Sequence, residues 1–309
     1  MTAHDHFERA SRAAVLATLA TNGVLAALLE GPASAEVLAD RLELHEGALA
    51  RALDVLVAMG LLERERDTFA VDADLQAQAA QGPAPLAAVL ALLQGLPQHL
   101  RTGNALVADR RDRGALYAKA TPGLGRMFAP AARQLAELLP PAATILDVGA
   151  GSGVWSLAMA RSAPACEVTA VDLEAVLGAF REAAVDVPHH TVAGDYHEVD
   201  PGGPFDRVVL ANVLHLEPPA RASRLLRRAA GWTRPGGELV VVDTLLRNAG
   251  NALTVSSYAL HLGLRIQGSQ VHDAMTVAQW AADVGLGVAA FHLLDPARGL
   301  GALVLQATP

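Results

Sequence analysis

The feature that most constrains the fold is an apolar run that ends in a glycine-rich turn, Ile145-Leu146-Asp147-Val148-Gly149-Ala150-Gly151-Ser152-Gly153. Such a run predicts a buried strand that passes through a tight turn into a helix. Glycines let a ligand approach the backbone, and the start of a helix offers it free N–H groups. The dinucleotide pattern GxGxxG is not matched, because Val154 stands where its third glycine belongs. We therefore expect a ligand site at the end of this strand.

Strand and helix patterns alternate after this turn. We expect strands over residues 144–148, 168–171, 191–193, 207–211 and 238–242, and helices over 154–160, 173–184 and 220–232. Alternation of this kind is typical of a parallel sheet with helices on both faces. Residues 287–306 hold two more strand candidates, separated by Asp295-Pro296 and Gly299, which predict an antiparallel hairpin at the edge. The fold class is thus α/β, with a mostly parallel, Rossmann-like sheet.

The N-terminal part has the pattern of a helical, winged-helix-like domain. Apolar residues recur at helical spacing over residues 13–29, with a break at Asn22-Gly23, and Ser34 is a typical N-cap for the next helix. Another helix is predicted over 46–59, and residues 61–71 indicate two short strands around an Asp67-Thr68 turn. Helix, helix, hairpin is the order of elements in a winged helix.

Breaks in the pattern divide the chain into three segments. A length of 309 residues suits about two domains. Residues 73–82, rich in Ala, Gln and Asp, predict a loop or hinge, and Pro140-Pro141 ends the last helical pattern before the first strand of the sheet. We expect a winged-helix-like dimerisation domain at 1–82, a helical linker and lid at 83–141, and a ligand-binding catalytic domain at 142–309.

Charge and composition favour a small-molecule partner. A net charge of −8 gives a surface that repels nucleic-acid phosphates and anionic lipid. A DNA-reading helix needs basic side chains, but residues 46–59 offer only Arg51 against Glu46 and Asp54. We therefore expect no nucleic-acid partner and assign the N-terminal domain to dimerisation or to a lid.

Cysteine usage and hydropathy bear on the compartment. Cys166 is the only cysteine, which excludes an intrachain disulfide and a CxxC zinc site. Residues 1–12 lack the pattern of a signal peptide, and the longest apolar stretch, 84–93, is short of the roughly 18 residues that span a bilayer. His189, His190 and His197 do not have the spacing of metal ligands. We expect a cytoplasmic protein with no metal and no membrane association.

Three further motifs follow the glycine-rich turn in chain order. Asp172 ends the second predicted strand, 21 residues after Gly151, where a carboxylate accepts hydrogen bonds from ribose hydroxyls. Gly194-Asp195-Tyr196 follows the third strand, and Pro235-Gly236-Gly237 precedes the fifth. Together with the turn, these motifs resemble the class I S-adenosylmethionine (SAM) dependent methyltransferases.

The resemblance implies that SAM is the cofactor and S-adenosylhomocysteine (SAH) its product. The motifs place the following residues at the cofactor: Asp147, Gly149, Gly151, Asp172, Leu173, Gly194, Asp195, Tyr196 and Asn212. By the same resemblance Gly149 and Gly151 face the methionine part, Asp172 holds the ribose, and Asp195 with Tyr196 borders the adenine.

The whole chain is similar to the small-molecule O-methyltransferases of plants and bacterial secondary metabolism, which join a winged-helix dimerisation domain to this catalytic domain. In that family a histidine in His-Asp-Trp, after the fourth strand, is the general base, and an acid 28 residues later orients it. His215 and Asp243 stand at these positions, 28 residues apart. A neutral imidazole, with its usual pKa of about 6.5, can remove a hydroxyl proton as the oxygen attacks the methyl group. A histidine that merely caps the strand remains the alternative.

Two departures from the family concern the acceptor. His215 is followed by Leu216-Glu217-Pro218 instead of Asp-Trp, and the second orienting acid, expected near Ala274, is missing unless Asp273 replaces it. The resemblance also implies an acceptor cavity lined by residues 258–272, with His261, Arg265 and His272 as binding candidates.

Three functions are consistent with these residues. The first is a methyltransferase on a small-molecule acceptor, most readily O-directed, with N- and C-methylation open. The second is a SAM-binding enzyme whose cofactor charge assists a pericyclic, decarboxylating or hydroxylating step without methyl transfer. The third is a ligand-sensing regulator that uses the winged helix on DNA. The SAM motifs and the weakly basic helix disfavour the third, and His215 with Asp243 favours the first over the second.

Overall fold

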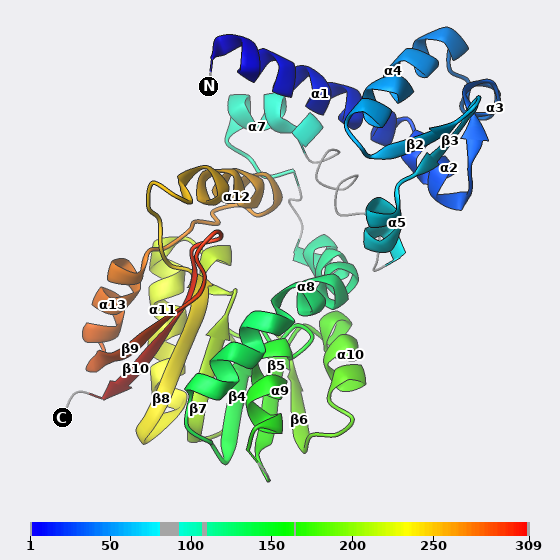
Figure 1. Cartoon of the computed structure of the whole chain (residues 1–309). Coiled ribbons are helices and arrows are strands. Elements are labelled where there is room, and N and C mark those ends of the chain that lie inside the picture. Colours follow the sequence, from blue (N-terminus) through cyan, green and yellow to red (C-terminus); the bar gives the residue numbers. More distant parts are fainter. Residues whose placement is uncertain (1, 81–92, 107–109, 164, 308–309) are drawn as a thin grey trace. The chain divides into compact units, whose positions relative to one another are not determined.

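The computed structural model describes residues 2–80, 93–106, 110–163 and 165–307 (Figure 1). The chain divides into two compact units, Met1–Arg101 and Thr102–Pro309. The helix α8 (Arg110–Leu138) therefore belongs to the same compact unit as the large sheet. Each unit is described by itself.

The N-terminal unit has the winged-helix order of elements. Its helices are α1 (Ala3–Thr21), α2 (Val24–Glu30), α3 (Ala35–Leu42), α4 (Glu46–Ala58), α5 (Ala73–Ala80) and α7 (Leu96–Thr102), the last of which ends at the boundary between the units. Strands β1 (Ala33–Ser34), β3 (Thr68–Val71) and β2 (Leu62–Glu65) form an antiparallel sheet in this order. The domain is therefore helical with a small sheet, and the predicted hairpin is confirmed.

Local signals explain most of these boundaries. Gly23, at φ +78°, separates α1 from α2, and the Ser34 hydroxyl accepts the Val37 N–H at the start of α3. The prediction of a loop over 73–82 is wrong for its described part, because residues 73–80 form α5. The carboxylate of Asp72 accepts the Leu75 N–H and caps this helix. The hairpin turn lies at Arg66-Asp67, one residue earlier than predicted.

The C-terminal unit contains a seven-stranded sheet in the order β6-β5-β4-β7-β8-β10-β9. The strands are β4 (Thr144–Val148), β5 (Glu167–Asp172), β6 (His189–Ala193), β7 (Phe205–Ala211), β8 (Thr233–Thr244), β9 (Leu286–Asp295) and β10 (Leu300–Ala307). Strands β4 to β8 are parallel, whereas β10 pairs antiparallel with β8 and with β9. The mostly parallel sheet and its antiparallel edge hairpin are thus confirmed.

Helices cover both faces of this sheet. One face packs on α8, α9 (Val154–Arg161) and α10 (Glu174–Ala183), with Leu135, Leu157 and Phe180 in the shared core. The other packs on α11 (Pro219–Trp232) and α13 (Ala274–Ala282) through Leu225 and Val277. The short helix η1 (Leu214–Leu216) follows β7, and α12 (Ala252–Arg265) follows β8. Strands covered on both faces read as continuous apolar runs, which is why their pattern was visible in the sequence.

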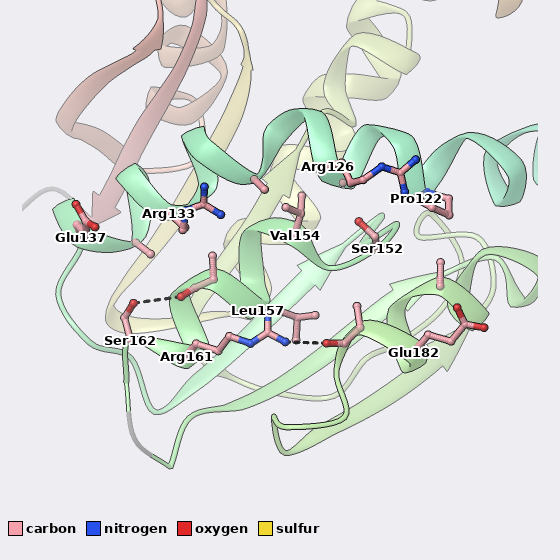
Figure 2. Close-up of a pocket in the computed structure, with 16 residues that line it drawn as sticks. Pro122, Arg126, Arg133, Glu137, Ser152, Val154, Leu157, Arg161, Ser162 and Glu182 are labelled. Atoms are coloured by element: carbon pink, nitrogen blue, oxygen red, sulfur yellow. Dashed lines mark hydrogen bonds between the residues drawn. The ribbon is translucent and has the colours of Figure 1, made fainter. Parts of the chain in front are cut away.

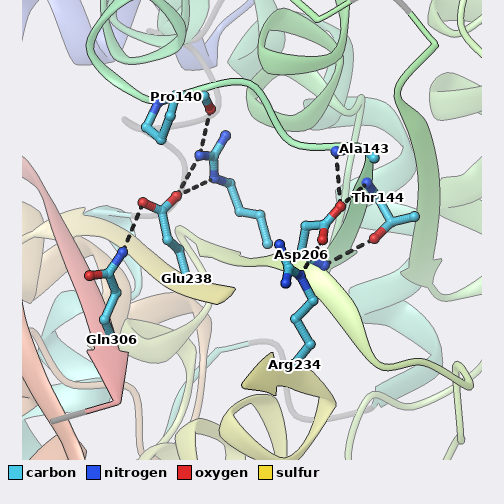
Figure 3. A network of polar contacts seen from close by, with 8 residues as sticks. Pro140, Ala143, Thr144, Asp206, Arg234, Glu238 and Gln306 are labelled. Carbon is cyan, nitrogen blue, oxygen red and sulfur yellow. Dashed lines mark hydrogen bonds and ion pairs between the residues drawn. The ribbon is translucent and has the colours of Figure 1, made fainter. Parts of the chain in front are cut away.

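A polar network ties together the amino-terminal part of the sheet (Figure 3). The Arg207 guanidinium donates to Glu238 at 2.5 and 3.0 Å and to the backbone oxygen of Pro140 at 2.8 Å. Asp206 accepts the N–H groups of Ala143 and Thr144, both at 2.9 Å. Because both Arg207 and Glu238 are buried, this pair links β7 to β8 in a region with little water.

No single helix among the described residues is long and apolar enough to cross a bilayer. The pair α1 and α2, bent by 64° at its break, meets the criteria of length and composition only when the two helices are taken together. Core helices of other proteins meet the same criteria, so this pair does not by itself identify a membrane-spanning segment.

Candidate functional site

The predicted motifs meet at the carboxyl ends of the parallel strands. The glycine-rich turn follows β4, Asp172 ends β5, Gly194 follows β6, and Asn212 follows β7. Strand order reverses its direction between β4 and β7, and ligands of such sheets bind at this switch point. The sheet therefore gathers residues that are far apart in the sequence at the place where this fold class holds a ligand.

The glycine-rich turn has a backbone that side chains would obstruct. Gly149, Gly151 and Gly153 have φ values of +71°, +58° and +69°. A Cβ atom on Gly149 would lie 2.7 Å from Val213, and one on Gly153 would lie 2.6 Å from the Phe180 ring. These positions require glycine both for conformation and for space.

The carboxylate of Asp172 holds the turn in place. Its Oδ2 accepts the N–H of Gly151 at 2.8 Å, and its Oδ1 accepts the N–H of Leu173 at 2.7 Å. Burial raises the pKa of Asp172 above its usual value, and these two backbone hydrogen bonds act against that shift. Each carboxylate oxygen can accept more than one hydrogen bond, so the group can serve the turn and a ligand together.

A cavity of about 280 Å³ opens beside this turn. Eight of the nine predicted cofactor residues line it: Gly149, Gly151, Asp172, Leu173, Gly194, Asp195, Tyr196 and Asn212. Leu216 and Glu217 continue the wall, and Tyr117 and Phe128 of α8 add aromatic surface. A glycine turn that lets a ligand approach the backbone, a carboxylate with spare acceptor capacity and aromatic walls fit the amino-acid, ribose and adenine parts of SAM.

Asp147 is the ninth predicted residue, and it does not line the cavity. It lies in the central strand β4, only 2% exposed, and the Ser156 hydroxyl donates to its Oδ2 at 2.5 Å. Burial raises its pKa to about 7, and the nearby charge of Asp172 acts in the same direction. The side chain of Asp147 thus contacts Ser156 of α9, the helix that follows the glycine-rich turn.

Asn212 turns the chain from β7 into η1. It has a left-handed φ of +57°, and its N–H donates to the backbone oxygen of Val242 at 2.7 Å. Non-glycine residues rarely adopt this conformation, and it is found often at functional sites. The turn brings His215 to the carboxyl edge of the sheet, next to the end of β8.

His215 and Asp243 form the predicted pair. His215 Nδ1 lies 2.7 Å from Asp243 Oδ1, and the His215 N–H donates to Oδ2 of the same carboxylate at 3.3 Å. The other ring nitrogen, Nε2, lies 3.1 Å from the Tyr258 hydroxyl on α12. The imidazole is therefore held at both nitrogens and is only 4% exposed.

Glu217, which marked a departure from the family pattern, is the centre of a second cluster. Its carboxylate accepts hydrogen bonds from the Tyr196 hydroxyl at 3.0 Å and from Arg221 at 2.7 Å, and lies 3.0 Å from His197 Nε2. Burial acts to raise the pKa of Glu217, but hydrogen bonds from Arg221, His197 and Tyr196 outweigh it and lower the pKa. The sequence pointed to Glu217 only as an unmatched residue.

The predicted acceptor residues are more scattered. His272 is buried, its Nε2 lies 3.0 Å from the backbone oxygen of Glu217, and its ring packs on Trp280. His261 and Arg265 are half-buried on α12, and burial followed by the charge of Arg265 lowers the pKa of His261. None of these three side chains lines the 280 Å³ cavity.

Asp273, the neighbour of the missing second acid, has a structural contact. Its carboxylate accepts the N–H of Thr276 at 2.7 Å and caps α13. The second polar contact of the His215 ring is Tyr258, on a different helix. Within the described parts of the chain, no three His, Cys, Asp or Glu side chains come together as a metal site would need.

A wider and more open hollow of about 770 Å³ lies against α8, α9 and α10 (Figure 2). Arg126 and Arg133 of α8 stand over it, with Arg161 of α9 opposite. Outside this view, Arg161 forms an ion pair with Asp186 at 2.6 Å. Gly125, Ser152 and Val154 line both this hollow and the cavity. None of the predicted site residues faces it, so we place the candidate active site at the smaller cavity.

Comparison with known proteins identifies two domains in this chain. Residues 145–237 match the model of a methyltransferase domain, and residues 18–68 match that of the MarR family. A mitomycin biosynthesis 6-O-methyltransferase of Streptomyces lavendulae is 28% identical over 290 residues, which cover 84% of this chain and 82% of that protein. Acetylserotonin O-methyltransferase of Mus musculus is 35% identical over 120 residues, 36% of this chain. The chain spans only 31% of the length of that second relative.

Solved structures share the fold over nearly the whole chain. Mitomycin 7-O-methyltransferase MmcR has a TM-score of 0.79 at 22% identity, covering 99% of this chain and 96% of its own. NcsB1, an O-methyltransferase from neocarzinostatin biosynthesis solved with SAM and 2-hydroxy-5-methyl naphthoic acid, has a TM-score of 0.75 at 20% identity, covering 96% of each chain. The chain therefore carries a methyltransferase domain, and over nearly its whole length it shares the fold of solved O-methyltransferases.

Proposed function

We propose that this protein transfers the methyl group of SAM to a hydroxyl oxygen of a small-molecule acceptor of the secondary-metabolite type. One observation carries the proposal: an imidazole oriented by a buried carboxylate at 2.7 Å stands at the same sheet edge as the cofactor cavity. The mitomycin relative is named for O-methylation, and NcsB1 was solved with a hydroxynaphthoic acid. Both support a hydroxyl acceptor, and the naphthoic acid bound to NcsB1 makes an aromatic hydroxyl the first class to test.

In this mechanism SAM supplies an electrophilic methyl group bonded to a positively charged sulfur. The glycine-rich turn and Asp172 orient the cofactor, and alignment of the two substrates lowers the entropic part of the barrier. Asp243 accepts the Nδ1–H of His215, which leaves the Nε2 lone pair to remove the acceptor proton. As the imidazole becomes charged, the adjacent carboxylate stabilises it.

The experiment is a panel of acceptors incubated with SAM, followed by measurement of SAH release. Hydroxynaphthoic acids, N-acetylserotonin and simple phenols form the panel, with amines and activated carbon acids as the N- and C-directed arms. We expect SAH and a methylated hydroxyl compound to appear in equal amounts. SAM binding without SAH release across the panel would favour the non-methylating alternative.

The ribose assignment gives a prediction for cofactor affinity. Asp172→Ala removes a charged acceptor from two ribose hydroxyls and also frees the N–H of Gly151 from its partner. We expect SAM binding to weaken by about 1 to 3 kcal/mol in calorimetry. Unchanged SAM affinity in a folded Asp172→Ala variant would show that Asp172 does not bind the ribose.

We propose that the N-terminal unit joins two copies of the chain and does not read DNA. The MarR-family match supports the winged-helix assignment, but α4 carries Arg51 as its one basic side chain beside Glu46 and Asp54. On α1 the side chain of Phe7 is 72% exposed, and Leu19 is the one buried residue. Exposed apolar surface of this kind favours association.

Light scattering on the full chain should give twice 32.1 kDa. A monomer at micromolar concentration with an intact N-terminal unit would rule out the dimer. Binding to duplex DNA at physiological salt would favour the alternative function as a DNA-binding regulator.

We also propose a cytoplasmic location, because the lone buried thiol of Cys166 suits a reducing compartment. Cell fractionation tests this location.

A further inference from the structure

The Tyr258 hydroxyl occupies the one position through which His215 can take a proton. With Asp243 at Nδ1, only Nε2 has a lone pair to offer, and the Tyr258 oxygen lies 3.1 Å from it. The two rings meet edge to face, with centroids 5.6 Å apart. Any route from an acceptor hydroxyl to the imidazole must therefore pass the phenol or displace it.

We propose that Tyr258 relays the acceptor proton to His215 and is thus a catalytic residue of this methyltransferase. This inference rests on the proposed function, because it needs an acceptor hydroxyl and His215 as the final base. The phenol donates its own proton to Nε2 and accepts the proton of the acceptor on its oxygen.

Three features of the site support a relay over a displaced phenol. The His215 imidazole is buried whereas Tyr258 is only half-buried, so the phenol is the more accessible of the two groups to an acceptor. With the Nδ1–H donated to Asp243, Nε2 is the acceptor and the Tyr258 hydroxyl is the donor, which leaves lone pairs on the phenol oxygen for the proton of the acceptor. Burial, and then the charge of Asp243, raise the pKa of Tyr258 well above its usual value, so the phenol keeps its proton until it transfers it.

The step balances without another reactant. The acceptor O–H bond breaks, its proton moves to the Tyr258 oxygen, and the proton of Tyr258 moves to His215 Nε2. The acceptor oxygen forms a bond to the methyl carbon as the sulfur–carbon bond breaks and its electron pair stays on sulfur. The products are a methyl ether, SAH and an imidazolium ion paired with Asp243, while Tyr258 regains its hydroxyl.

The test is Tyr258→Phe, which keeps the ring and removes the relay oxygen. Two acceptors are used: the panel phenol that the wild type methylates fastest, and the same phenol carrying a ring nitro group, assayed at mildly alkaline pH. A nitrophenol is largely ionised under these conditions and needs no proton acceptor. We expect kcat to fall about 100-fold with the parent phenol and less than about tenfold with the nitrophenol.

Controls separate the relay from packing and from the proposed function. Ser256→Ala removes an exposed α12 hydroxyl that contacts Arg247, and it should leave both rates unchanged. Equal losses with the two phenols would make Tyr258 structural, and unchanged or faster turnover would mean that His215 meets the acceptor directly; either result overturns the relay. If His215→Ala still abolishes turnover in that case, the proposed function stands. If His215→Ala keeps full turnover, the assignment of the base fails first.

Discussion

Replacing His215 with alanine should lower methyl transfer by about 100-fold or more at neutral pH, while SAM affinity stays nearly unchanged. The expected loss follows from removing the group that we propose as the proton acceptor. Cofactor affinity should survive because the cavity is lined by neighbours of His215, not by the imidazole itself. Single-turnover rates together with SAM calorimetry on the same preparation measure both quantities.

Asp243→Asn is the matched comparison. It keeps the volume at the end of β8 but removes the negative charge, and it replaces one of the two carboxylate oxygens that contact His215 by an NH2 donor. We expect a smaller loss than for His215→Ala, because the imidazole remains. A large drop in SAM binding in His215→Ala would instead make that histidine structural, and full turnover in both variants would move proton removal to another group, with His261 and His272 next to examine.

Arg207→Met should lower the free energy of unfolding of the C-terminal unit by about 3 to 5 kcal/mol. The change leaves Glu238 mostly buried without its cation and frees the backbone oxygen of Pro140 from its donor. Breaking one side of a buried ion pair is costly because the remaining charge stays desolvated. Chemical denaturation followed by tryptophan fluorescence measures the loss.

Two variants control for this interpretation. Arg207→Met combined with Glu238→Met removes both charges and should recover most of the stability, since apolar pairs of similar volume replace buried ion pairs well. Arg298→Met breaks an exposed pair with Asp295, whose side chains are 53% and 25% exposed, and should cost less than about 1 kcal/mol. Equal losses of unfolding free energy for Arg207→Met and Arg298→Met would show that burial of the Arg207–Glu238 pair does not increase its contribution to stability.

Much of the C-terminal fold follows from local pattern. Strands covered on both faces show as apolar runs, and turns with positive φ show as glycines, so β4, β5, β7, β8 and the turn after β4 were predictable. The lengths of the strands were less predictable. The Arg-Pro-Gly-Gly segment has the composition of a turn, so the sequence predicts that β8 begins at residue 238, whereas it begins at Thr233. The helix α5 forms where composition predicts a loop, because its cap, Asp72, lies just outside the Ala-, Gln- and Asp-rich segment.

The wall of the cavity was predictable from the sequence, and the polar contacts around His215 were not. Motif order placed eight residues on the cavity, whereas Asp147 looked like one of them and is buried in the central strand. The contact between Tyr258 and His215 joins residues 43 apart, and that between Tyr196 and Glu217 joins residues 21 apart. Such contacts depend on how α12 and η1 pack against the sheet, which no local pattern encodes.

The most direct test of methyl transfer follows the methyl group itself. SAM labelled with carbon-13 on its methyl group is incubated with the protein and the acceptor panel, and the products are read by NMR. We predict a labelled O-methyl signal that appears at the same rate as SAH and disappears with His215→Ala. A label that stays on SAM while the acceptor changes, or that moves to nitrogen or carbon, would contradict O-methylation by this protein.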